Sequence, residues 1–202
     1  SENHGGWEVA GMNWKRLVLP VAVLSILVFS GSAFAAEFKA DMAVETAGET
    51  ITSKVYVSGS LMRHETKIPG GGMNISIFDG ARGIMYVLMP EEKMFMEFPN
   101  DQIVLGDEDI EKKLSGEADL KKIGTETIDG YQCDKYEVIY KDPDMRDMDS
   151  SVVWVARKLN FPIKGVSEGK DGTVIVTYKN IEEEAIDRSL FEIPKDYKKF
   201  SF

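Results

Sequence analysis

The stretch IMYVLMPEEKMFMEF, residues 84–98, decides the fold of this chain. It consists of two runs of alternating side chains joined by a turn at residues 90–93, which predicts a β-hairpin. With Met89 opposite Met94, one face is entirely apolar and consists of Met85, Val87, Met89, Met94, Met96 and Phe98. The other face carries Ile84, Tyr86, Leu88 and Phe95, with Glu97 as its one charge. Such a pair is either covered on both sides, or covered on one side and lining a cavity on the other.

The same alternation extends outward in both directions from the hairpin. Upstream, Phe38, Ala40, Met42 and Val44 alternate with polar residues, and turn sequences follow at residues 47–49, 58–60, 69–72 and 79–80. Downstream, residues 123–128, 131–140, 152–157, 163–168 and 173–181 have the strand pattern. We therefore predict a mainly β fold, a curved antiparallel sheet or half-open β-barrel of about ten strands. One or two short helices are expected, at residues 104–116 and in a turn capped by Asp187.

The N-terminal residues have the order of a secretory signal peptide. A basic start at residues 12–16 precedes an apolar run at 17–29 and a small-residue stretch that ends at Ala35. The apolar run is shorter than the ~20 residues that span a membrane as a helix. We expect residues 1–11 to be a tag or an over-extended start, 12–35 a signal peptide, and 36–202 a single domain. Cleavage near Ala35 would place that domain in the periplasm or outside the cell, and no cysteine stands there to attach a membrane anchor.

Composition and missing motifs exclude several classes of function. The net charge of −10 disfavours binding to nucleic acid or to anionic membrane surfaces. The one cysteine, Cys133, excludes an intramolecular disulfide and is expected to be a small buried hydrophobe. His64 is the one histidine after residue 35, and no HExxH, GxSxG, P-loop or GxGxxG motif is present. We therefore expect no enzyme, cofactor or metal site, and expect His64 to point outward or to hydrogen-bond locally.

The apolar face of the hairpin is the main candidate site. Methionine is flexible and polarizable, which suits a surface that must fit an irregular apolar partner. The candidate lining for such a ligand consists of Met42, Val44, Met85, Val87, Met89, Met94, Met96 and Phe98. Two alternatives stay open: these residues are ordinary core, or the thioethers bind Cu(I).

The segment 142–149 carries four carboxylates. Calcium favours such clusters, but the spacing does not match an EF-hand and no glycine stands at the turn position. A solvated loop between two strands is the preferred interpretation.

Several short motifs together resemble the LolA/LolB-like group of periplasmic proteins, the outer-membrane lipoprotein carriers and their relatives. They are Arg63-His64-Glu65, Phe78-Asp79-Gly80, Met85-Tyr86-Val87, residues 90–93 and the closing residues 189–197. Residues 124–133 are similar to a related branch of secreted proteins, DUF4412. The resemblance implies a half-open antiparallel barrel with an apolar concave face lidded by helices, which relatives use to hold acyl chains or sense lipids. The chain departs from the carriers by starting with a strand at Phe38 and by having no arginine near residues 58–59.

Two functions follow as expectations. The first is a soluble, non-enzymatic exported protein that binds a lipid or the acyl chain of an acylated protein on the concave face of the sheet. The second is an envelope protein–protein interaction module with a filled core, whose edge strands and residues 142–149 contact the partner.

Overall fold

The computed structural model describes residues 36–68, 72–99, 118–140, 148–169 and 172–200. For residues 148–150 only the backbone is described. The predicted signal peptide, the predicted helix at 104–116 and most of the acidic segment at 142–149 lie outside the described residues.

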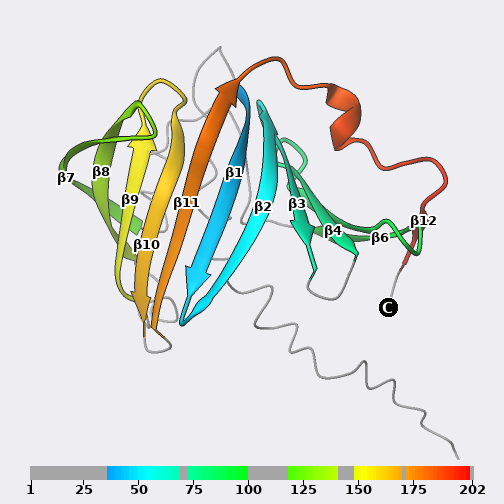
Figure 1. Cartoon of the computed structure of the whole chain (residues 1–202), viewed down its shortest axis with the longest axis horizontal. Helices are drawn as coiled ribbons and strands as arrows, with labels where there is room; N and C mark the ends of the chain where they lie inside the picture. Colours follow the sequence, from blue (N-terminus) through cyan, green and yellow to red (C-terminus); the bar gives the residue numbers. More distant parts are fainter. Residues whose placement is uncertain (1–35, 69–71, 100–117, 141–147, 170–171, 201–202) are drawn as a thin grey trace, which may run out of the picture.

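Twelve strands form one sheet in the described part of the chain. The strands are β1 (Glu37–Thr46), β2 (Glu49–Ser58), β3 (Leu61–Lys67), β4 (Met73–Asp79), β5 (Ile84–Met89), β6 (Met94–Pro99), β7 (Ala118–Ile128), β8 (Tyr131–Tyr140), β9 (Met148–Ala156), β10 (Phe161–Gly169), β11 (Gly172–Glu183) and β12 (Lys198–Lys199). Their order in the sheet is β12-β6-β5-β4-β3-β2-β1-β11-β10-β9-β8-β7 (Figure 1). All neighbours are antiparallel except the short β12, which runs parallel to β6.

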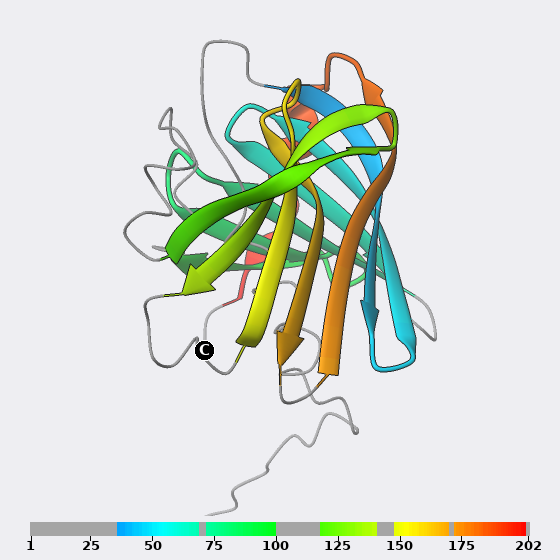
Figure 2. The ribbon, with the colours of Figure 1, turned by 90° about the vertical axis from the view of Figure 1, so that its left-hand side faces the viewer.

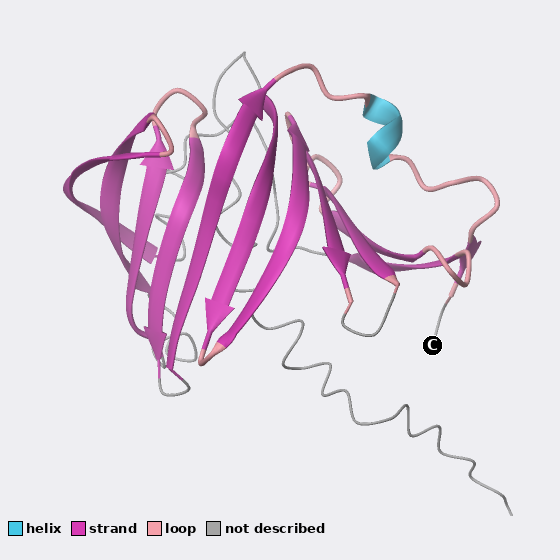
Figure 3. Cartoon of the chain, viewed as in Figure 1, coloured by secondary structure: helices cyan, strands magenta, loops and turns pink. Residues whose placement is uncertain are grey.

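The prediction of a mainly β, curved antiparallel sheet is confirmed. Strands dominate the fold in Figure 3, and Figure 2 shows from the side that the sheet is curved. The estimate of about ten strands was slightly low, because the two-residue β12 carries no alternation of its own. The one helix in the described ranges is a short 3-10 helix, η2 (Arg188–Phe191).

The two halves of the chain meet in the middle of the sheet. The first half runs outward from β1 to β6, the second half returns from β7 to β11, and β11 then pairs with β1. Phe161 on β10 packs edge-on against both Phe38 on β1 and Tyr178 on β11, with ring centroids 5.1 and 5.2 Å apart. Alternate residues of β1, Phe38, Ala40, Met42 and Val44, are buried in the same cluster. We call the sheet face that bears them the inner face.

The opposite, outer face of the central strands carries charged side chains. Lys39 on β1 contacts Glu182 and Glu184, each at 3.0 Å, and Lys54 on β2 contacts Asp41. Elsewhere in the sheet, the buried ring of Trp154 on β9 lies 4.6 Å from each of two ammonium groups, those of Lys135 on β8 and Lys164 on β10. Exposed ion pairs each stabilise a fold only slightly, so the main effect of these charges is to keep the outer face of the central strands hydrated.

The C-terminal residues cover the outer face of β3 to β6. Ile186 and Phe191 are buried there against Ile75, Ile77, Tyr86 and Leu88. Asp187 caps η2 by accepting a hydrogen bond from the Ser189 amide at 2.9 Å, as the sequence predicts. The Arg63 guanidinium donates to the carbonyl of Leu190 at 2.7 Å and fixes the helix to β3.

Candidate functional site

The β5–β6 hairpin has the register that its sequence predicts. Met89 lies opposite Met94, Val87 opposite Met96 and Met85 opposite Phe98, so the six apolar residues share the inner face. Each of the six is half-buried. On the reverse side, Tyr86 and Leu88 are buried beneath the C-terminal residues. The hairpin is thus covered on its outer side and only partly covered on its inner side.

Met42 and Val44 lie on the same inner face but in a different setting. Both are buried in the central core. Three strands, β2, β3 and β4, separate them from β5 in the sheet. The structure therefore divides the candidate lining into a half-exposed group on the hairpin and two buried residues on β1.

Strand pairing arranges the inner face into three parallel rows that cross β1 to β6. The first row is wholly apolar and consists of Phe38, Val57, Met62, Phe78, Met85 and Phe98. The second is mixed and consists of Ala40, Val55, His64, Ser76, Val87 and Met96. The third runs from Met42 through Ser53 and Thr66 to Asn74, next to the Met89–Met94 pair. Polarity therefore increases from the first row to the third.

His64 is buried on this inner face, so the expectation that it points outward is wrong. Its Nε2 atom lies 2.7 Å from the sulfur of Met62, and its ring centroid is 5.3 Å from that of Phe78. The alternative expectation, a local hydrogen-bonding contact, is the one the structure has. Burial lowers the pKa of His64 from 6.5 to about 4, so the imidazole is neutral at physiological pH.

A small group of polar side chains lies beside the hairpin in the second and third rows. The hydroxyl groups of Ser53 and Thr66 share a hydrogen bond of 2.7 Å, and Ser76 donates to the side-chain oxygen of Asn74 at 3.3 Å. Asn74 is half-buried, and its amide N–H groups have no partner among the described residues. This group was not identified from the sequence. The pattern that indicates it is the placing of polar residues two apart on one strand face, His64 with Thr66 and Asn74 with Ser76.

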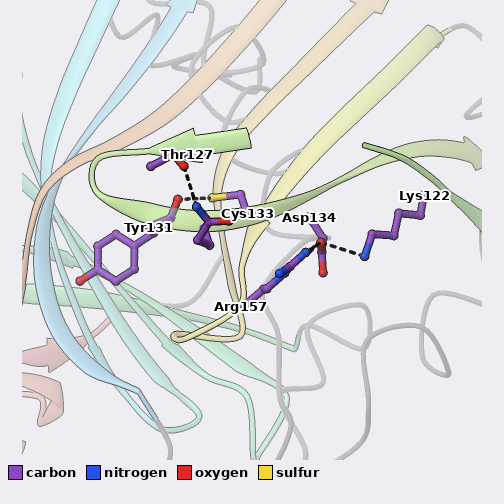
Figure 4. Close-up of polar contacts among 7 residues, drawn as sticks. Lys122, Thr127, Tyr131, Cys133, Asp134 and Arg157 are labelled. Atoms are coloured by element: carbon purple, nitrogen blue, oxygen red, sulfur yellow. Dashed lines mark hydrogen bonds and ion pairs between the residues drawn. The ribbon is translucent and has the colours of Figure 1, made fainter. Parts of the chain in front are cut away.

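Cys133 is buried, as its sequence setting predicts. Burial raises the pKa of its thiol, which donates to the carbonyl of Tyr131 at 3.4 Å (Figure 4). The adjacent Asp134 binds Arg157 at 2.6 Å and Lys122 at 2.8 Å, and both contacts lower the pKa of the carboxyl group. These contacts join β7, β8 and the turn after β9. No three His, Cys, Asp or Glu side chains form a metal-binding group in the described ranges.

The curved antiparallel sheet with its apolar inner face defines the class of open, barrel-like β proteins. More particularly, the chain belongs to the family described as Domain of unknown function (DUF4412), whose model matches residues 37–160. The match confirms the similarity to DUF4412 that the sequence predicts for residues 124–133. A search of curated protein sequences finds no match.

Solved structures share this fold at low sequence identity. A structure of the Pseudomonas aeruginosa MucA/MucB complex is 12% identical over 95% of this chain, with a TM-score of 0.54. A structure of MucB in complex with MucA(peri) is 11% identical over 93% of this chain, with a TM-score of 0.51. This chain spans 64% and 62% of the chains in those two structures. At these identities the likeness shows the fold alone.

A LolA superfamily protein from Nitrosomonas europaea is also similar, with 11% identity over 87% of this chain and 96% of that one. Its TM-score is 0.38, which is too low to support a functional comparison. Across the described ranges, no helix has the length and apolar character that crossing a membrane requires.

Proposed function

We propose that this protein is an exported, non-enzymatic protein that holds the apolar part of a lipid or of an acylated protein on the inner face of β5 and β6. The observation that carries the proposal is the asymmetry of the hairpin. On its outer side Tyr86 and Leu88 are buried under the C-terminal residues, whereas all six apolar side chains of its inner side are half-buried. Apolar surface that is grouped and left partly exposed commonly marks a binding site.

The chemistry of the six residues supports an acyl chain as the ligand. Four of them are methionines, whose unbranched side chains adapt to an irregular apolar partner. Burial of each CH₂ group contributes about 0.8 kcal/mol, so a long acyl chain gains enough free energy without an ionic contact. Met42 and Val44 are buried in the same sheet face with three strands between them and the hairpin, so they would bound the proposed site and would not contact the ligand as the hairpin does.

The proposal is tested by titrating the purified protein with a pyrene-labelled fatty acid and its methyl ester. We expect saturable binding of at least one probe, and loss of that binding in the Met89→Glu/Met96→Glu variant. Ile139→Glu is a control, because it also replaces an apolar side chain with glutamate, at a position on β8 that is 51% exposed and lies away from the hairpin. The absence of saturable binding, or equal binding by wild type and the double variant, would contradict the proposal.

A second candidate function is binding of a partner protein. The fold likeness includes MucB in complex with MucA(peri), and strand β7 (Ala118–Ile128) pairs on one side only within the described sheet. An edge strand can accept a strand from another chain. Copurification of one defined protein from the host, with no lipid in the native mass spectrum, would favour this function over the first.

A further inference from the structure

The three rows of the inner face carry no charged side chain within the described strands, although 29% of the whole chain is charged. All positions of its three rows within the described strands are apolar residues, Ser, Thr, Asn or the neutral His64. Lys39, Asp41 and Lys54 of β1 and β2 lie instead on the outer face, where they form ion pairs. A ligand on these rows therefore meets no counter-ion among their described residues.

This absence of charge limits the ligands that the face can hold. A carboxylate, phosphate or ammonium group moved from water onto an apolar surface pays a large desolvation cost unless an opposite charge compensates it. No basic or acidic side chain among the described residues of these rows supplies that compensation. An uncharged polar group, such as an ester, amide or alcohol, pays a much smaller cost, which one or two hydrogen bonds offset.

Hydrogen-bond donors for an uncharged group lie at one end of the hairpin. Asn74 neighbours Thr66 in the third row, two residues along β4 from the Ser76–Val87 pair. The oxygen of its side chain already accepts a hydrogen bond from Ser76, while its N–H groups have no partner in the described part of the chain. The first row at the other side is wholly apolar, from Phe38 to Phe98.

We propose that the ligand is an uncharged amphiphile, such as an acylglycerol, with its ester or hydroxyl oxygens at Asn74 and its acyl chain along the hairpin towards Met85 and Phe98. The inference rests on the proposed function and specifies the ligand class of the same site. It assigns Asn74 as the residue that positions the polar end of the ligand. It also explains why the polar side chains of the inner face gather in the second and third rows.

The test compares three ligands with the same acyl chain: monoolein, oleate at a pH well above its carboxyl pKa, and oleylamine. Binding is measured by isothermal titration calorimetry below the concentration at which each ligand aggregates. We expect monoolein to bind at least about tenfold more tightly than either ionic ligand, because neither charge is compensated. Asn74→Leu is expected to weaken monoolein binding by roughly fivefold, since it removes the donors and keeps the face uncharged.

A second variant tests the inference by a gain of binding to a charged ligand. Asn74→Lys is expected to strengthen oleate binding by about tenfold, whereas Thr52→Lys, the same change at an exposed position of β2, leaves it unchanged. Oleate binding to the wild type as tightly as monoolein would overturn the inference and leave the proposed function standing. Failure of all three ligands to bind saturably would overturn both.

Discussion

At the scale of single residues, His64 couples the stability of the fold to pH. Burial lowers its pKa from 6.5 to about 4 in the folded chain. As the pH falls below 6.5 the unfolded chain takes up a proton that the folded chain does not take up until about pH 4. The contribution of the neutral imidazole to the free energy of unfolding is therefore complete above pH 6.5. As the pH falls from 6.5 towards 4, that contribution is lost by roughly 1.4 kcal/mol per pH unit.

The prediction is tested by urea unfolding of wild type and His64→Leu at about pH 7.5 and about pH 5.5. We expect the wild type to lose roughly 1 kcal/mol more than the variant between these two values. The window lies above the range in which Asp41 and Asp134 titrate, because their ion pairs lower the pKa of both carboxyl groups. An equal loss in both proteins would show that His64 does not carry the effect.

At the scale of elements, two methionines on the inner face distinguish the core from the proposed binding surface. Met62 on β3 is 1% exposed, whereas Met96 on β6 is half-buried. We expect Met62→Ala to lower the free energy of unfolding by about 2–5 kcal/mol, and Met96→Ala to lower it by about 1 kcal/mol or less. Denaturant unfolding of the two variants measures the difference.

A large cost of Met96→Ala, similar to that of Met62→Ala, would mean that the hairpin face is ordinary packed core. The acyl-binding proposal would then lose its main support. The comparison is well matched, because both substitutions remove the same atoms from the same sheet face.

The elements differ in how far the sequence predicts them. The β5–β6 register follows from a four-residue turn between two alternating runs, which leaves Met89 opposite Met94 as the natural pairing. The start of β7 is five residues earlier than predicted, because Lys121, Lys122 and Gly124 show no apolar alternation and a register shift interrupts the strand. The alternation also predicts that β5 is apolar on both of its faces. It does not predict that the residues after 183 cover the outer one.

At the scale of the whole molecule, the fold depends on strands near the end of the chain. The family match ends at residue 160, yet β10 and β11 are the strands that join β9 to β1. Without them the sheet would fall into two pieces, and Phe38 would lose its contact with Phe161. We expect a fragment that ends at residue 160 to have no cooperative thermal transition.

Near-UV circular dichroism and thermal melting of the fragment, compared with the full chain, provide the measurement. Addition of the segment 161–202 as a separate polypeptide is expected to restore part of the signal. A fragment that melts cooperatively on its own would show that the two halves of the sheet are independent.

The position of β1 in the middle of the sheet could not be predicted from the sequence. Its partners on β11 lie far away in the chain, as in the pairing of Met42 with Tyr178. A period of two shows which side chains share a face within a strand, but it does not show which distant strand lies alongside. For the same reason the three rows of the inner face, and with them the position of Asn74, emerged only from the assembled sheet.

The ring of Trp154 between two lysines has a practical consequence for spectroscopy. The other two tryptophans of the chain, Trp7 and Trp14, precede the predicted cleavage point, so Trp154 would be the single indole of the exported protein. It lies on β9, on the other side of β1 from the hairpin in the strand order. Its fluorescence emission should therefore change when the protein unfolds, and should not change through direct contact with a bound acyl chain.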